Sequence, residues 1–129
     1  MSGEFLLDTN IVVALFEDDP GVLQHLRQRP RISISITVLG ELYYGAFKSA
    51  KLNENLKRIN DLYSEVTLFE SDAETAYEYG NIKNELQTKG RPIPTNDVWI
   101  AATARQHGLI LVSRDKHFAV VDYLSWEQW

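Results

Sequence analysis

The residues with the clearest chemical potential in this chain are acidic, and each stands beside an apolar segment. They are Asp8, Glu41, Asp97 and Asp115. Carboxylates gathered in one place repel one another and raise each other's pKa unless cations neutralise them. Hard oxygen ligands of this kind select Mg²⁺ or Mn²⁺. Such ions activate water and stabilise the leaving oxygen in phosphodiester hydrolysis, a reaction that needs no nucleophilic serine or cysteine.

Whether these acids meet depends on the elements that carry them, and the chain alternates between strand and helix patterns. Apolar or alternating runs predict strands at 5–7, 31–36, 66–69 and 109–112, and a fifth at 118–121. Helical spacing predicts helices at 11–16, 20–26, 37–48, 53–63, 72–87 and 95–107. Thr37 and Asp72 are the expected N-caps of two of them. The alternation predicts a three-layer α/β/α sandwich with a central, mostly parallel sheet.

In such a sheet the helices run back against the strands, so helix N-termini and strand C-termini share one edge. Asp8 and Asp115 follow the first and fourth predicted strands. Glu41 lies in the opening turns of the helix after the second strand, and Asp97 lies in the first turn of the helix that Thr95 opens. All four acids therefore map to the same edge. Lateral convergence depends on strand order, for which we expect the first and fourth strands at the centre.

The bulk composition narrows the class of protein. With 129 residues, 44% hydrophobic and 24% charged, the chain has the size and balance of one globular domain, and we expect a single domain over residues 1–129. The absence of cysteine excludes disulfides and thiolate metal sites, and makes the cytoplasm the expected compartment. No apolar run reaches the roughly 20 residues of a membrane span, and the acidic start Met1–Glu4 does not fit a signal peptide.

The formal net charge of −5 argues weakly against a nucleic-acid partner, because sequence-independent binding to phosphates normally uses Lys and Arg. Net charge is a poor guide where acids cluster around bound cations, since the cations invert the local field. The net charge therefore does not exclude a substrate that contains phosphate.

At the acidic positions the sequence resembles the PIN-domain ribonucleases, and most closely the toxins of VapBC toxin–antitoxin pairs. Four stretches carry the resemblance, in the order in which the family has them. They are LLDTN at 6–10, GELYYG at 40–45, NDVWIAATA at 96–104 and LVSRDKHF at 111–118. Each stretch alone is a weak signal. Together they span nearly the whole chain and form a strong one.

The resemblance implies a catalytic and metal-binding quartet. Its members are Asp8, Glu41, Asp97 and Asp115. Asp8 and Asp97 correspond to the family's usual direct magnesium ligands. Asn10 is similar to a polar residue that often supports the first acid, and Ser113 stands where the family has a Thr or Ser that orients water or metal.

The same resemblance implies a PIN-like fold, Mg²⁺ as the cofactor with Mn²⁺ as a substitute, and RNA as the substrate. It also implies a homodimer and a VapB-type antitoxin. The antitoxin would wrap the toxin with an amphipathic segment and block the acidic pocket with a basic side chain, through a strong charge-assisted pair. Contact with DNA is expected only through the complex with the antitoxin.

Each acid also has an ordinary structural explanation. Asp8 is a suitable N-cap, Glu41 is compatible with a solvated helix face, and Asp115 is compatible with a simple turn. Asp97 near a helix start is favoured by the helix dipole, which agrees with a metal role as well. The agreement of all four positions favours the metal site.

The remaining charged residues indicate less about function. Acids at 17–19 and 70–78 are expected to be solvated or to cap helices. The three histidines show no metal-ligand spacing and are expected to be structural or surface residues: His25, His107 and His117. Arg114 and Lys116 flank a proposed ligand, so contact with an RNA phosphate and an ordinary charged surface both remain open.

Several functions compete at this point. The leading one is hydrolysis of RNA by metal-activated water, which leaves a 5′-phosphate on the downstream fragment. A binding module that mainly represses its own operon with the antitoxin is disfavoured by the intact quartet. A phosphatase with Asp8 as nucleophile usually has a second Asp two residues later, where this chain has Asn10. A housekeeping RNA-processing nuclease is not separated from a toxin by sequence, and the RNA target and number of ions do not follow from it.

Overall fold

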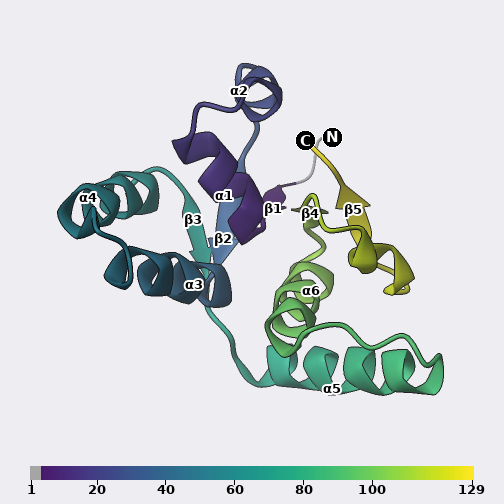
Figure 1. The fold of residues 1–129 in the computed structure, drawn as a ribbon. Helices are drawn as coiled ribbons and strands as arrows, with labels where there is room; N and C mark the ends of the chain where they lie inside the picture. Colours follow the sequence, from purple (N-terminus) through teal and green to yellow (C-terminus); the bar gives the residue numbers. More distant parts are fainter. Residues whose placement is uncertain (1–3) are drawn as a thin grey trace.

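The computed structural model describes residues 4–129, and its strands form one sheet in the order β3-β2-β1-β4-β5. The strands are β1 (Phe5–Leu7), β2 (Ile32–Ser35), β3 (Thr67–Phe69), β4 (Ile110–Val112) and β5 (Ser125–Glu127). Each neighbouring pair is parallel. Figure 1 shows β1 in the middle of the sheet with β4 beside it, as expected. The prediction that the chain starts without a signal peptide rests on its first residues, and residues 1–3 lie outside the described residues.

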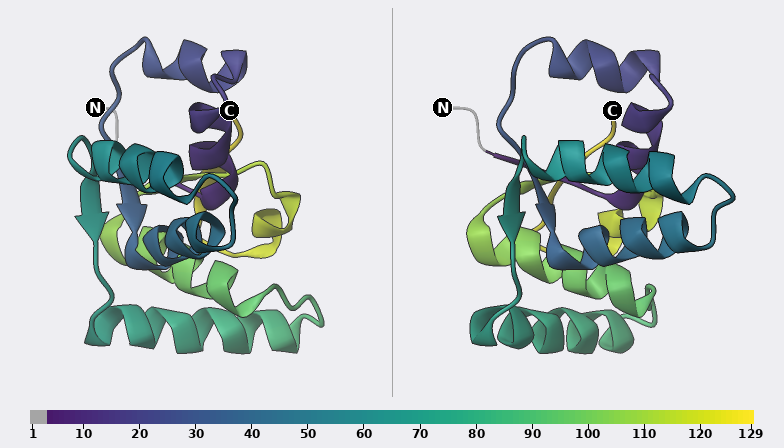
Figure 2. Two further views of the ribbon diagram at one scale, coloured as in Figure 1. Left: turned by 60° about the vertical axis from the view of Figure 1, so that its left-hand side comes forward. Right: turned by 90° about the vertical axis from the view of Figure 1, so that its left-hand side faces the viewer.

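Six α-helices and one 3₁₀ helix connect the strands in the described part of the chain. They are α1 (Thr9–Phe16), α2 (Pro20–Leu26), α3 (Ile36–Phe47), α4 (Leu52–Tyr63), α5 (Ala73–Thr88), α6 (Thr95–His107) and η1 (Lys116–Val120). Crossovers between parallel strands are right-handed. The connections from β1 to β2 and from β2 to β3 cross the sheet in one direction, and the connection from β3 to β4 crosses back. Their helices therefore cover opposite faces of the sheet. In the right-hand view of Figure 2, α5 and α6 lie below β1, whereas α4 lies in front of it and α1 lies mostly above it. The predicted three-layer sandwich is confirmed.

Burial on both faces of the sheet explains why the central strands are continuous apolar runs in the sequence. Leu6 and Leu7 of β1 and Leu111 and Val112 of β4 have no exposed surface, because helices cover both faces of the sheet. Complete burial of one such side chain stabilises the fold by about 1.5–3 kcal/mol. The residues that directly follow these two strands are therefore held at a rigid edge. Among the described residues no helix is long and apolar enough to cross a membrane.

Helix α6 is the element that carries Asp97, and it is packed between β4 and α5. Its small residues Ala101, Ala102 and Ala104 are buried, which lets the neighbouring elements approach its backbone closely. The left-handed Gly108 (φ 64°) ends the helix, as predicted, because glycine adopts this conformation without steric strain. This packing holds α6, the helix that carries Asp97, against the rest of the fold.

The N-caps were predicted with partial success. Asp72 caps α5, where its side chain accepts a hydrogen bond from Thr75 N at 3.1 Å. The expectation that Thr37 caps α3 was wrong, because the helix begins directly at the end of β2 and Ser35 is the cap. Ser35 Oγ accepts a hydrogen bond from Val38 N at 3.1 Å.

The fifth strand was predicted at the wrong place. Residues 118–121 lie in and just after η1, and the strand that pairs with β4 is β5, later in the chain. Phe118 and Val121 are both buried and three positions apart, which is the repeat of a 3₁₀ turn rather than of a strand. A four-residue apolar run does not distinguish the two by itself.

Candidate functional site

Asp8 is the most deeply buried of the four acids, with 5% of its surface exposed. It follows β1 and is also the N-cap of α1, where its Oδ1 accepts a hydrogen bond from Thr9 N at 2.8 Å. Its Oδ2 accepts a second hydrogen bond, at 2.6 Å, from Ser113 Oγ. Burial raises the pKa of Asp8, and these two hydrogen bonds oppose that rise. The capping role and a site role therefore coincide in one side chain.

Ser113 connects the ends of β1 and β4. Besides donating to Asp8, its Oγ accepts hydrogen bonds from the backbone N of Asp115 at 3.0 Å and from Asn10 Nδ2 at 3.3 Å. The side-chain oxygen of Asn10 accepts from the backbone N of Arg114 at 3.2 Å. Asn10 and Ser113 thus lie beside the first and fourth acids, where they were expected.

Glu41 lies in the second turn of α3 and is held at both of its carboxylate oxygens. Thr9 Oγ1 donates to Oε1 at 2.6 Å, and Asn96 Nδ2 donates to Oε2 at 3.3 Å. Thr9 and Asn96 were not predicted as site residues. Each stands next to an acid of the quartet in the sequence, and that adjacency was the signal that could have identified them.

Asp97 lies in the first turn of α6, as predicted, and its side chain is 17% exposed. Burial, followed by the nearby charge of Asp8, raises the pKa of Asp97 to about 6, while the charge of His117 opposes that rise. Glu41 and Asp115 raise the pKa of Asp97 further. The four acids therefore interact electrostatically, which means that they converge at one edge of the sheet.

His117 also lies against this cluster, although the sequence indicated only a structural or surface residue. Its Nε2 lies 2.9 Å from Asp97 Oδ2, and its Nδ1 lies 2.9 Å from Asp115 Oδ1. The histidine follows Asp115 by two residues, in the first turn of η1 and just before the segment that was predicted as a strand.

Arg114 is turned towards another part of the molecule. Its guanidinium forms an ion pair with Asp19 at 2.7 Å and donates to the backbone O of Trp129 at 3.0 Å. The hydrogen bond from Arg114 lowers the pKa of Asp19. Lys116 has an exposed side chain beside a shallow hollow that His117 also lines.

The arrangement of the acids fits a divalent cation. Asp8, Thr9, Asn10, Val13, Glu41, Asp97 and Asp115 line an open hollow of about 480 Å³. Its charged ligand atoms are oxygens. Two of its carboxylates, Asp8 and Asp97, have raised pKa values because they are largely buried and because neighbouring carboxylates add negative charge. A bound cation relieves that repulsion, and carboxylate oxygens suit hard divalent ions.

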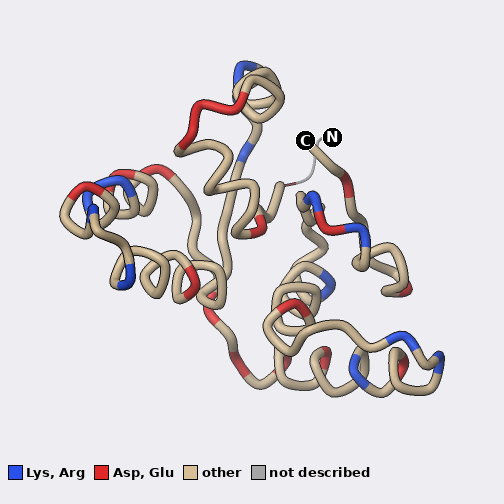
Figure 3. The backbone as a smooth tube through the Cα atoms, viewed as in Figure 1, with Lys and Arg blue, Asp and Glu red and all other residues tan. Residues whose placement is uncertain are grey.

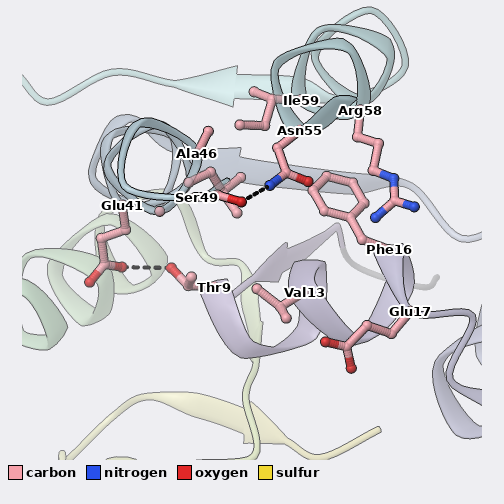
Figure 4. Close-up of a pocket in the computed structure, with 12 residues that line it drawn as sticks. Thr9, Val13, Phe16, Glu17, Glu41, Ala46, Ser49, Asn55, Arg58 and Ile59 are labelled. Atoms are coloured by element: carbon pink, nitrogen blue, oxygen red, sulfur yellow. Dashed lines mark hydrogen bonds between the residues drawn. The ribbon is translucent and has the colours of Figure 1, made fainter. Parts of the chain in front are cut away.

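A second, more apolar groove adjoins this hollow and runs between α1, α3 and α4 (Figure 4). It has a volume of about 360 Å³, and its lining includes Val13, Phe16, Ala46 and Ile59. Thr9, Val13 and Glu41 line both spaces, so the groove opens into the acidic hollow. Figure 3 shows Lys and Arg spread over several helices and loops rather than gathered along one surface stripe.

Comparisons with known proteins agree with this geometry. Residues 5–124 match the model of the PIN domain family. The chain is 39% identical to ribonuclease VapC2 of Haemophilus influenzae, with 98% of each chain covered. It is 36% identical to the tRNA(fMet)-specific endonuclease VapC of Shigella flexneri, again over 98% of each. The structure superposes on the VapBC2 complex of Rickettsia felis, solved with a promoter DNA fragment, with a TM-score of 0.91, 31% identity and 98% of each chain covered. The chain therefore belongs to the PIN-domain family and, within it, to the VapC ribonucleases.

Proposed function

We propose that this chain, as a single PIN domain, is a divalent-metal-dependent endoribonuclease and the toxin of a toxin–antitoxin pair. Its catalytic and metal-binding residues are Asp8, Glu41, Asp97 and Asp115, and Mg²⁺ is the proposed ion. The observation that carries the proposal is the convergence of these carboxylates, from four elements, at the C-terminal edge of the sheet. Two relatives are named as a ribonuclease and as a tRNA-specific endonuclease, which supports RNA hydrolysis as the reaction.

The chain's own residues have distinct parts in this reaction. When bound, the divalent ion supplies a Lewis acid that activates water and offsets charge on the phosphate. Asp8 and Asp97 hold the ion, and Ser113 keeps Asp8 in place through its 2.6 Å hydrogen bond. Glu41, fixed by Thr9 and Asn96, completes the ligand set or orients water.

The RNA class to test first is transfer RNA. The relatives from Shigella flexneri and Salmonella typhimurium are both described as tRNA(fMet)-specific endonucleases, at 36% and 32% identity. The open hollow accepts a phosphodiester flanked by nucleotides, because the acids lie at a surface edge rather than in a closed cavity.

The antitoxin is proposed to bind the groove between α1, α3 and α4. Several structural relatives are complexes of the VapBC type, so a VapB partner is expected for this chain. An amphipathic segment placed along the apolar wall would bring a basic side chain to Glu41 at the end of the groove. A homodimer, with DNA contact through the antitoxin, completes the proposed assembly.

The experiment is cleavage of total transfer RNA by purified, antitoxin-free protein in Mg²⁺, with new 5′ ends mapped by sequencing. We expect discrete ends that carry a 5′-phosphate and that disappear after chelation and in Asp97→Asn. Asp61→Asn, on the exposed face of α4, is the matched control and should cut like the unmodified protein. Discrete ends that persist in Asp97→Asn would contradict the proposed site, and no cleavage by folded protein would contradict the proposed activity.

A further inference from the structure

His117 is a nitrogen donor inside an otherwise oxygen-only cluster. Its ring is 27% exposed and lies between Asp97, on the first turn of α6, and Asp115, at the start of η1. Each ring nitrogen faces one of these two carboxylates at 2.9 Å. The ring packs at an angle against Phe118, with 4.8 Å between ring centroids, and Phe118 is fully buried in the core. The imidazole is therefore held at a fixed position rather than free in solvent.

One ring nitrogen of His117, Nε2, is buried without a hydrogen bond to any partner within residues 4–129, although Asp97 Oδ2 is only 2.9 Å away. The contact thus has the distance of a hydrogen bond without its alignment. A buried polar atom without a hydrogen-bond partner requires an explanation, and coordination of a metal ion is one.

The spacing of the donors suits a metal ion shared between them. Asp97, Asp115 and His117 each offer one ligand atom, and these atoms lie within 4.8 Å of one another. Two ligands at right angles around an ion, with bonds of about 2.1 Å, are separated by about 3 Å. The 2.9 Å between Nε2 and Asp97 Oδ2 matches that separation. An ion bound by both atoms lies away from the line that joins them, which agrees with the poor hydrogen-bond alignment.

We propose that His117 is a ligand of the divalent ion through Nε2, together with Asp97, and that Asp115 accepts a hydrogen bond from Nδ1 and orients the ring. Carboxylates that receive the second N–H of a metal-binding histidine have this role in many metal sites. The inference rests on the proposed metal-dependent function and adds an imidazole to its acidic ligands.

The imidazole changes which ions the site prefers. Mg²⁺ selects oxygen ligands, whereas first-row transition ions accept imidazole nitrogen, with an affinity that rises from Mn²⁺ to Cu²⁺ and is lower again for Zn²⁺. His117 should therefore raise the affinity for Co²⁺ or Zn²⁺ while adding little for Mg²⁺, which the carboxylates bind. The site would then favour transition ions more strongly than a quartet of acids alone.

The first test measures the ligand directly. Mn²⁺ is bound to the intact chain, and pulsed electron paramagnetic resonance is used to detect coupling to a directly bound ¹⁴N nucleus. We expect this coupling in the unmodified protein and in His107→Asn, which changes an exposed histidine away from the cluster. We expect its loss in His117→Asn, whose amide still reaches towards Asp115 but has no counterpart of Nε2. Absence of the coupling in unmodified protein with Mn²⁺ bound, or its persistence in His117→Asn, would overturn the proposal.

The second test measures ion preference by calorimetry with Co²⁺ and with Mg²⁺. In His117→Asn the Kd for Co²⁺ should rise by about ten- to a hundredfold, and the Kd for Mg²⁺ should rise much less. Equal loss for both ions would contradict a nitrogen ligand. His117→Gln, which places an amide near the position of Nε2, serves if His117→Asn does not fold.

These results are separable from those on the proposed function. Protein that binds Mn²⁺ and cuts RNA without nitrogen coupling retains the ribonuclease proposal and loses the role of His117. Protein that binds no divalent ion loses both.

Discussion

At the residue scale, the site is a set of carboxylates held in place by neutral hydrogen-bond donors. Thr9 and Ser113 each donate to an acid at 2.6 Å, and Asn96 donates to Glu41 at 3.3 Å. Neutral donors orient a carboxylate without cancelling its charge, so the acids remain available to a cation. Arg114 stands next to Asp115 in the sequence, but its guanidinium forms an ion pair with Asp19 rather than with an acid of the site. This arrangement leads to two predictions about single side chains.

Ser113→Ala should weaken metal binding without removing any acid. The change deletes the donor to Asp8 Oδ2 and the acceptor for Asp115 N, so both acids lose part of their orientation. We expect a Kd for Mn²⁺ that is about ten- to a hundredfold higher, by calorimetry. Ser64→Ala, whose hydroxyl is exposed at the end of α4, is the control. Unchanged Mn²⁺ affinity in Ser113→Ala would show that this hydrogen bond does not position a metal ligand.

Asp97 should make the metal-free protein less stable as pH rises. The pKa of Asp97 is about 6 in the folded chain, against an ordinary value of 3.8 for an aspartate. Between these values the folded state keeps a proton that the unfolded state has released, so stability falls as pH rises from about 4 to about 6. The loss is at most about 3 kcal/mol, at about 1.36 kcal/mol per pKa unit.

Thermal unfolding after chelation, measured from pH 4 to pH 7, tests this expectation. Asp97→Asn should have the higher Tm at pH 7 and a flatter dependence on pH than the unmodified chain. Asp61→Asn should follow the unmodified chain. The Tm of the metal-free protein could instead rise steadily between pH 4 and pH 6, with the same curve for Asp97→Asn. That result would mean that deprotonation of Asp97 does not destabilise the folded protein.

At the element scale, the sequence predicted best the strands and helices that lead to the acids. The strand before Asp8, the helix that carries Asp97 and the glycine that ends it all lie where their patterns placed them. The segment after Asp115 was the failure, because a four-residue apolar run fits a strand or a turn equally well. His117 was not predicted near the acids because the three histidines show no metal-ligand spacing in the sequence, and its position beside Asp97 arises only in the folded chain.

The N-cap of α3 gives a test at the same scale. Ser35→Ala should lower the free energy of unfolding by about 1–2 kcal/mol, because Val38 N loses its acceptor in a buried position. Thr37→Ala, at the position that the sequence had indicated, should change it by much less. Denaturant unfolding of the two variants checks the order. A larger loss in Thr37→Ala would place the cap at Thr37 after all.

At the scale of the whole molecule, the acidic hollow and the apolar groove form one continuous surface. The parallel sheet brings strand ends and helix starts to one edge, which sequence patterns predict, whereas lateral convergence required the strand order. The groove was not predictable, because α1, α3 and α4 meet only through tertiary packing. Its continuity with the hollow means that a partner in the groove can also close the site.

Gly45→Leu should weaken antitoxin binding. Gly45 lines the groove on α3, and a Cβ added there meets no atom within 4 Å, so the new side chain extends into the open groove. Replacing a mid-helix glycine also favours the helix by up to about 1 kcal/mol, so misfolding is not expected. We expect at least a tenfold higher Kd for the cognate antitoxin, measured by calorimetry.

Gly80→Leu is the matched control for that variant, because Gly80 is also an exposed helical glycine with open space, but on α5. It should bind the antitoxin like the unmodified chain. Equal affinities for Gly45→Leu and Gly80→Leu would place the antitoxin on another surface.

The most direct test of the central claim is the rate of RNA cleavage as Mg²⁺ is added back to chelated, antitoxin-free protein. With RNA in single-turnover conditions, we predict no cleavage without the ion, a rate that rises with Mg²⁺ and saturates, and loss of that response in Asp8→Asn and Asp97→Asn. A rate that persists in chelator, or that survives replacement of either aspartate, would contradict the assignment of these carboxylates as a metal-dependent ribonuclease site.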